Sequence, residues 1–251
     1  MALRMFAPTD LDPEQLQRHI LSTYLDIRIG IAIIGILFPF LLWIGGRIHG
    51  GLSLQGSMSA YYYTPMRDWF VGLLFATGTF LILYKGFSIA EDWALNVGGA
   101  LAVGVAIFPM PLEQGKEWIT LHGFCAIGLF LCMAFVALFC AGDTLDLIKD
   151  TKIPSPEKVI ARLKRLYQGL GIAMILAIAA AYLLNTALNT GRSTFWVEAA
   201  GILFFGAYWL VKSEELRRTQ AELKTVRGET KKVNGRVMSV APRAFGKSTQ
   251  P

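Results

Sequence analysis

Charged residues are scarce in this chain. They make up 17% of its 251 residues, whereas apolar residues make up 54%, and an average soluble domain is about 25% charged. This balance argues against a soluble enzyme, a disordered chain and a disulfide-stapled scaffold, and it favours an integral membrane protein. The chain has 24 Lys and Arg against 18 Asp and Glu. Because these basic residues flank apolar stretches, we expect contact with membrane lipids and none with nucleic acid.

Histidine and cysteine are also few, with three of each. Cys125, Cys132 and Cys140 share one apolar stretch but lie too far apart on a helix to bridge each other, so no disulfide framework is implied. A b-type haem needs a pair of histidines, and only His49 and His122 fall on one predicted side of the membrane. The chain also lacks His-x-x-x-His, Cys-x-x-Cys, P-loop and Gly-x-Ser-x-Gly spacings. We therefore expect no metal and no cofactor.

Six apolar stretches approach the length of about 20 residues that a helix needs to cross a membrane. Tryptophan or tyrosine marks many of their ends, as is typical of the membrane interface, and recurrent Gly and Ala favour close helix packing. The second stretch reaches a usable length if Thr64 caps it and Pro65 is its first helical residue. We predict an all-α fold, a polytopic transmembrane bundle of six helices. The predicted spans are residues 29–46, 69–84, 93–112, 118–142, 166–191 and 193–211.

The distribution of basic residues predicts the orientation. Twenty Lys and Arg residues lie in the two terminal segments and in the loops on their side, and four lie in the loops on the other side. Positively charged loops stay in the cytoplasm. We therefore expect a multi-pass protein of the cell inner membrane with both termini inside.

The terminal segments complete the predicted domain organisation. Residues 1–28 form a cytoplasmic segment with an amphipathic surface helix, residues 29–211 form the transmembrane domain, and residues 212–251 form a basic cytoplasmic tail that is partly disordered. The apolar positions of the surface helix are Leu16, Ile20, Tyr24 and Ile27. We expect the tail to bind anionic lipid, because each basic residue near such a surface adds up to about 1 kcal/mol.

Three ionisable residues lie inside the predicted spans, where they are costly and are therefore candidates for function. Asp68, His122 and Glu198 open the second, fourth and sixth spans. All three spans start at the outer face in the predicted topology, so we expect the three side chains to converge. With their polar neighbours they form the predicted ligand-binding cluster, which consists of Ser59, Tyr62, Arg67, Asp68, His122, Arg192 and Glu198.

The residues of this cluster also have structural interpretations. Asp68 suits the positive end of a helix dipole, His122 can bond a backbone carbonyl at the interface, and Glu198 can pair with an arginine. A functional cluster would bind a lipid headgroup or a small polar ligand. Two alternatives stay open. One is a lipid-directed membrane hydrolase that uses Ser59, Asp68 and His122, and the other is a small proton-coupled transporter or accessory subunit that uses Asp68 and Glu198.

One part of the chain, residues 57–142, has a recognisable set of short motifs. They are SMSAYYYTPMRDWFVGLLFA (57–76), Tyr84-Lys85-Gly86, Glu91-Asp92, Asn96 and Phe108-Pro109. On these motifs the chain resembles an uncharacterised family of bacterial six-helix inner-membrane proteins, which implies the fold and no particular activity. It is also loosely similar to the DRAM-like family and to the membrane hydrolases that include alkaline ceramidases, which combine a serine, an aspartate and histidines near one membrane face. The His-x-x-x-His of those hydrolases is absent here, so a zinc-dependent amidase activity is not implied.

Overall fold

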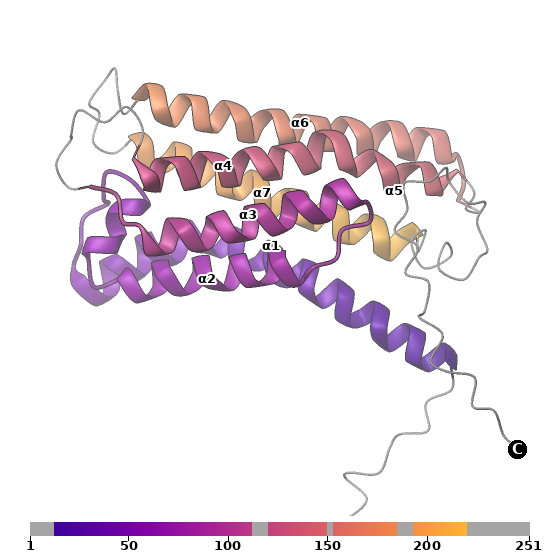
Figure 1. Cartoon of the computed structure of the whole chain (residues 1–251), viewed down its shortest axis with the longest axis horizontal. Coiled ribbons are helices and arrows are strands. Elements are labelled where there is room, and N and C mark those ends of the chain that lie inside the picture. Colours follow the sequence, from indigo (N-terminus) through magenta and orange to yellow (C-terminus); the bar gives the residue numbers. More distant parts are fainter. Residues whose placement is uncertain (1–12, 112–119, 150–152, 185–192, 220–251) are drawn as a thin grey trace, which may run out of the picture.

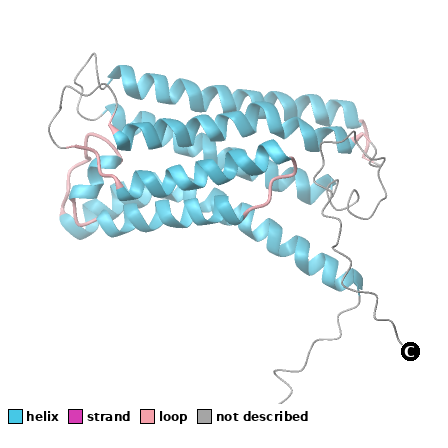
Figure 2. Cartoon of the chain, viewed as in Figure 1, coloured by secondary structure: helices cyan, strands magenta, loops and turns pink. Residues whose placement is uncertain are grey.

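The computed structural model describes residues 13–111, 120–149, 153–184 and 193–219. All regular secondary structure in these ranges is helical (Figures 1 and 2). The elements are α1 (Pro13–Gly50), the short 3-10 helix η2 (Ser59–Tyr63), α2 (Arg67–Leu83), α3 (Ile89–Ile107), α4 (Leu121–Phe135), the π-helix η3 (Val136–Cys140), α5 (Ala141–Ile148), α6 (Pro156–Leu183) and α7 (Ser193–Thr219). The prediction of an all-α fold is confirmed.

The described residues form six helical rods, which pack into one closed bundle. Because α4, η3 and α5 follow one another without a break, they make a single rod. α2 packs against α3, α3 against α4, α4 against α6 and α6 against α7, and α1 contacts both α7 and α2. Figure 1 shows the rods side by side, with the first part of α1 extending away from the others. The first and last helices in the sequence therefore close the ring.

Four of the six rods are long and apolar enough to cross a membrane. They are Arg18–Gly50, Leu121–Ile148, Pro156–Leu183 and Ser193–Thr219. The other two are shorter: α2 has 17 residues, and α3 has 19 with two acidic residues in its first turn. At about 1.5 Å per residue, α2 is about 26 Å long, slightly less than a hydrocarbon layer of about 30 Å. Six spans with both termini inside stay a prediction.

The first helix differs from its prediction. The sequence predicted a surface helix up to residue 28 and a separate span from residue 29, whereas α1 is continuous from Pro13 to Gly50. Residues 14–29 contain neither Gly nor Pro, so nothing in the chain interrupts the helix at this point. Arg28, which was placed in the cytoplasmic segment, is fully buried within the bundle.

Other helix ends also differ from the predicted spans. α2 begins at Arg67 rather than Pro65, because Thr64 instead accepts a hydrogen bond from the Met66 N–H (3.1 Å) in a turn before the helix. α6 begins at Pro156, ten residues before the predicted span. α7 continues beyond the last predicted span to Thr219, as the spacing of Glu214 and Arg218, one helical turn apart, predicts. Hydropathy locates the apolar part of each helix, while polar turns extend the helix beyond it.

The two short helices, α2 and α3, approach each other backbone to backbone. A Cβ atom added to Gly78 would lie 2.7 Å from the Gly99 carbonyl oxygen, and one added to Gly99 would lie 2.6 Å from the Gly78 carbonyl oxygen. A side chain at either position would push the helices apart. Such contacts are the reason for small residues within helices that pack in a membrane.

The buried apolar residues form two cores, one toward each end of the bundle. The first includes Tyr84 and Trp209, and the second includes Phe70 and Phe195. On α1, Arg28 contacts the first core, and the helix continues past the second core to Arg47. The two arginines are 19 positions apart in the sequence, which is about 28 Å along a helix and close to one hydrocarbon thickness.

Candidate functional site

Polar side chains gather at both ends of the bundle. We call the first group, at the end where η2 lies, the η2 cluster; its members are Ser59, Tyr62, Arg67, His122 and Glu198. We call the second group, at the opposite end, the Arg28 network; its members are Tyr24, Arg28, Tyr84, Glu91, Thr144, Tyr167, Lys212 and Glu215. The predicted ligand-binding cluster contains all members of the first group and none of the second.

His122 joins three elements of the η2 cluster. It lies in the first turn of α4, whose N-cap Thr120 accepts a hydrogen bond from the Gly123 N–H (3.1 Å). The His122 Nδ1 atom is 2.7 Å from the carbonyl oxygen of Phe108, and its Nε2 atom is 2.8 Å from Ser59 Oγ. A carbonyl oxygen can only accept, so Nδ1 carries the proton of the neutral ring, and Nε2 then accepts the Ser59 O–H. This arrangement gives Ser59 a base oriented by a third group.

Glu198 holds the chain segment before η2. It lies in the second turn of α7, and its Oε2 atom accepts a hydrogen bond from the Met58 N–H at 2.6 Å. Close by, the Phe195 N–H donates to the Gly56 carbonyl oxygen at 3.1 Å. The start of α7 therefore anchors residues 56–58 independently of His122.

The remaining members of the η2 cluster lie near its surface. The Arg67 guanidinium donates to Tyr62 Oη (2.8 Å) and stacks over the Tyr62 ring, 4.5 Å from the ring centre. Ser59 and Tyr62 are three residues apart in a 3-10 helix, so they share one side of it. Burial raises the pKa of the neighbouring Tyr61 phenol, which therefore stays neutral. The cluster thus offers a hydroxyl, an imidazole and an exposed guanidinium together.

Two predicted members do not join this cluster among the described residues. Asp68 is exposed in the first turn of α2 and has no hydrogen bond or ion pair within the described part of the chain. The groups bonded to the ring nitrogens of His122 are Ser59 and the Phe108 carbonyl, so Asp68 does not orient the imidazole. Arg192 lies outside the described residues. A proton-coupled transporter would use Asp68 and Glu198 as a pair, and no contact of Asp68 within the described residues joins it to Glu198.

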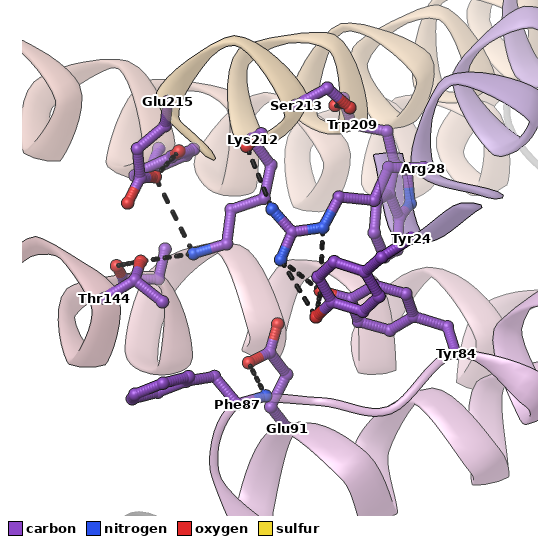
Figure 3. Close-up of polar contacts among 12 residues, drawn as sticks. Tyr24, Arg28, Tyr84, Phe87, Glu91, Thr144, Trp209, Lys212, Ser213 and Glu215 are labelled. Carbon is purple, nitrogen blue, oxygen red and sulfur yellow. Dashed lines mark hydrogen bonds and ion pairs between the residues drawn. The ribbon is translucent and has the colours of Figure 1, made fainter. Parts of the chain in front are cut away.

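The Arg28 network is centred on a guanidinium that is fully buried. Arg28 Nε donates to Tyr84 Oη (3.0 Å), Nη1 donates to the Lys212 carbonyl oxygen (3.1 Å), and Nη2 donates to Tyr24 Oη (3.1 Å). The Tyr24 and Tyr84 rings stack at 5.0 Å, and the Tyr24 hydroxyl donates to Tyr84 Oη. Figure 3 shows these side chains converging between α1, α7 and the turn after α2.

Lys212 is the second buried cation of the network. Its ammonium donates to Thr144 Oγ1 and lies 3.7 Å from Glu215 Oε2. Glu215 also accepts the hydroxyl hydrogen of Tyr167, whose ring centre is 5.5 Å from the Lys212 Nζ atom. Thr144 lies on α5, one turn after the π-helix η3, so an irregular helix segment lies beside this contact.

Glu91 reaches the network from the first turn of α3. Ser88 caps α3 by accepting the Glu91 N–H (3.3 Å), and Glu91 Oε2 accepts the Phe87 N–H (2.8 Å). The Glu91 carboxylate points toward Arg28 and Lys212 in Figure 3. The two cations and the two carboxylates, Glu91 and Glu215, balance one another, as buried charges must. The segment from Tyr84 to Asn96 therefore connects α2 to α3 and places two of its side chains, Tyr84 and Glu91, in the Arg28 network.

The sequence analysis missed the Arg28 network because its members carry other signals. Arg28 and Lys212 count as basic residues that set orientation, and Lys212 opens the predicted tail of residues 212–251. In the structure Lys212 lies within α7 and is 0% exposed, so its side chain belongs to the bundle. From the sequence, Glu91 is interpreted as an acidic residue at the start of a helix, and Tyr84 and Tyr167 are interpreted as aromatic residues of the membrane interface. One feature of the sequence could have indicated the network: acidic as well as basic residues lie next to the apolar spans on the predicted cytoplasmic side.

The described residues contain no group of three or more His, Cys, Asp or Glu side chains that could hold a metal ion. In the η2 cluster Ser59 and Glu198 are partly buried and Arg67 is exposed, whereas Arg28 and Lys212 of the Arg28 network are fully buried. Comparison with protein-family models, with curated proteins and with solved structures finds no match to this chain.

Proposed function

We propose that this chain is a multi-pass protein of the cell inner membrane, with six spans and both termini in the cytoplasm, whose η2 cluster binds a lipid headgroup or another small polar ligand at the outer face. Four membrane-length helices support the membrane placement. The excess of basic residues on the other side of the predicted bundle supports the orientation. Association of the basic residues beyond α7 with anionic lipid belongs to the same proposal and concerns residues outside the described ranges.

The observation that carries the binding proposal is the Ser59–His122 pair. Both side chains are polar, their Oγ and Nε2 atoms lie 2.8 Å apart between η2 and the first turn of α4, and Ser59 is only partly buried. The exposed Arg67 guanidinium lies on the same segment, stacked on Tyr62. A headgroup or small ligand with an anionic or hydroxyl function finds both acceptors and donors here.

Molecules bound to the full chain, purified from membranes in mild detergent, provide the test. We expect mass spectrometry to detect a polar ligand bound to the wild type and to Asp68→Asn, whose side chain is exposed and outside the cluster. The bound amount should fall about five-fold in Ser59→Ala, because one hydrogen bond is worth about 1 kcal/mol. Equal amounts in all three proteins would overturn the binding proposal.

A second candidate function is a lipid-directed hydrolase, and the geometry of Ser59 and His122 favours it. A serine that donates to a neutral imidazole whose other nitrogen is held by an acceptor is the arrangement of a nucleophile and its base. Ser59 Oγ would attack the carbonyl carbon of an acyl ester or amide while His122 Nε2 takes the hydroxyl proton. The imidazolium would return that proton to the leaving oxygen or nitrogen, and water would then release the acyl group.

A fluorophosphonate probe distinguishes this candidate from simple binding. The probe labels an activated serine, so the hydrolase predicts labelling of the wild type and of Ser53→Ala, an exposed serine near the same end, and no labelling of Ser59→Ala. Absence of labelling in the wild type would remove the hydrolase and leave the binding proposal in place.

A further inference from the structure

A groove lies at the end of α1, beside the loop that follows it. Its volume is about 350 Å³, and it is lined by Trp43, Ile44, Arg47, Ile48, Leu52 and Leu54. Gly51 adopts a positive φ of 59°, which ends the helix, and the Leu52 N–H then donates to the Gly46 carbonyl oxygen (3.1 Å). The loop thus folds back along α1 and forms the second wall of the groove.

The lining is apolar except for one guanidinium. Ile44 is 49% exposed and Ile48 is 75% exposed, so the groove presents hydrocarbon side chains outward. Arg47 is exposed, and its side chain has no hydrogen bond or ion pair within the described ranges. Arg67, at the same end of the bundle, is by contrast stacked on Tyr62 and bonded to its hydroxyl. Arg47 therefore has donors to offer an anion.

The groove lies at the depth expected of the membrane interface. Trp43 packs edge-on against Trp196, with ring centres 5.3 Å apart, and paired tryptophans are typical of that depth. Arg47 lies about 28 Å along α1 from Arg28, so one hydrocarbon thickness separates it from the buried network. An amphiphile at this place would have its polar part at Arg47 and its chains toward the bundle middle.

We propose that the Arg47 groove binds a phosphate-bearing membrane lipid. The guanidinium contacts the phosphate, for which its fork of N–H donors is suited, and an acyl chain lies along Trp43 and Ile44. This lipid site rests on the membrane placement given above. It shares no residue with the η2 cluster, so it does not depend on which ligand that cluster takes.

Native mass spectrometry of the full chain tests the site with defined lipids. The protein is transferred from nanodiscs that contain either dioleoyl phosphatidylglycerol or dioleoylglycerol, which differ in the phosphate headgroup. We expect the wild type to retain phosphatidylglycerol and to lose dioleoylglycerol. In Arg47→Gln, retention of phosphatidylglycerol should fall about five-fold, because the neutral amide cannot form the charge-assisted hydrogen bonds of a guanidinium to the phosphate.

Two matched variants make the result specific. Arg18→Gln removes an exposed arginine from the opposite end of the same helix, and Ser59→Ala disables the η2 cluster. Both should retain phosphatidylglycerol as the wild type does. The proposal is overturned if Arg47→Gln retains the lipid fully, if either control loses as much, or if the wild type retains dioleoylglycerol equally well. The comparison of phosphatidylglycerol with dioleoylglycerol uses the wild type alone, so it does not depend on whether a variant folds. If only the η2 cluster fails to bind a ligand, the proposal for the Arg47 groove still stands.

Discussion

The η2 cluster and the Arg28 network use polar side chains in opposite ways. In the η2 cluster, His122 and Glu198 each bond a backbone atom of another segment, at Phe108 and Met58, and Arg67 remains exposed. In the Arg28 network, side chains bond mainly to other side chains, and the two cations are 0% exposed. The η2 cluster holds the segment before α2 in place and keeps polar groups accessible to a ligand. The Arg28 network holds helix ends together, and neither of its cations is accessible to solvent.

Electrostatics explains why this difference matters. A buried charge that loses its partner costs about 3–5 kcal/mol, whereas a pair that is complete contributes little net stability. The Arg28 network is therefore sensitive to the removal of any single member. The η2 cluster consists of hydrogen bonds worth about 1 kcal/mol each, so it tolerates single changes in the fold while losing function.

The largest effect is expected for Arg28→Met. The substitution removes the guanidinium that donates to the Tyr24 and Tyr84 hydroxyls, and with it one of the two buried cations that face Glu91. The free energy of unfolding should therefore fall by about 3–5 kcal/mol. Titration with sodium dodecyl sulfate in mixed micelles measures it. Arg67→Met is the control from the η2 cluster and should unfold nearly as the wild type does. Equal losses in both variants would erase the distinction between the two regions.

The same chemical change at the two carboxylates sharpens the comparison. Glu215→Gln removes the charge that lies 3.7 Å from the buried Lys212 ammonium, and it should cost about 3 kcal/mol. Glu198→Gln keeps an oxygen that accepts the Met58 N–H, so its cost should stay below about 1 kcal/mol. The same titration compares them. A Glu198→Gln protein as unstable as Glu215→Gln would mean that the two ends are built alike.

Losses of stability smaller than those of Arg28→Met and Glu215→Gln are expected when one hydroxyl is removed at each end. Thr144→Val leaves the Lys212 ammonium short of one acceptor inside the bundle and should cost about 2 kcal/mol. Ser59→Ala removes one neutral hydrogen bond and should cost about 1 kcal/mol or less, because Glu198 and Phe195 still anchor the segment. Thermal unfolding followed by circular dichroism resolves the order, and a reversed order would speak against the assigned roles.

Sequence reasoning predicted the helices from their apolar runs and selected His122 and Glu198 by a related argument. Each is an ionisable residue in an apolar run, and such residues are costly in a membrane. The same argument also selected Asp68, which lies outside the η2 cluster. Sequence reasoning even anticipated that His122 bonds a backbone carbonyl. The sequence placed Ser59 and His122 in one cluster, but it could not predict their direct contact at 2.8 Å, which depends on how the segment before α2 folds.

The Arg28 network lay beyond sequence reasoning because its members come from distant positions and look ordinary in their own segments. Arg28 and Lys212 are 184 positions apart, and each is at the end of an apolar run, where a cytoplasmic arginine or lysine is expected. Only the packing of α7 along α1 brings them together. Likewise, hydropathy could not show that α1 is continuous, since a change from amphipathic to apolar sequence does not break a helix.

The central claim is that the two regions lie at opposite faces of a membrane, with the η2 cluster outside. Cysteine labelling tests it most directly, with Ser53→Cys beside the η2 cluster and Lys158→Cys near the start of α6, both exposed, in a chain whose three native cysteines are replaced by alanine. An impermeant maleimide added to intact cells should label Ser53→Cys alone and should label Lys158→Cys only after the cells are opened. Labelling of Lys158→Cys in intact cells, or of both positions equally, would contradict the account.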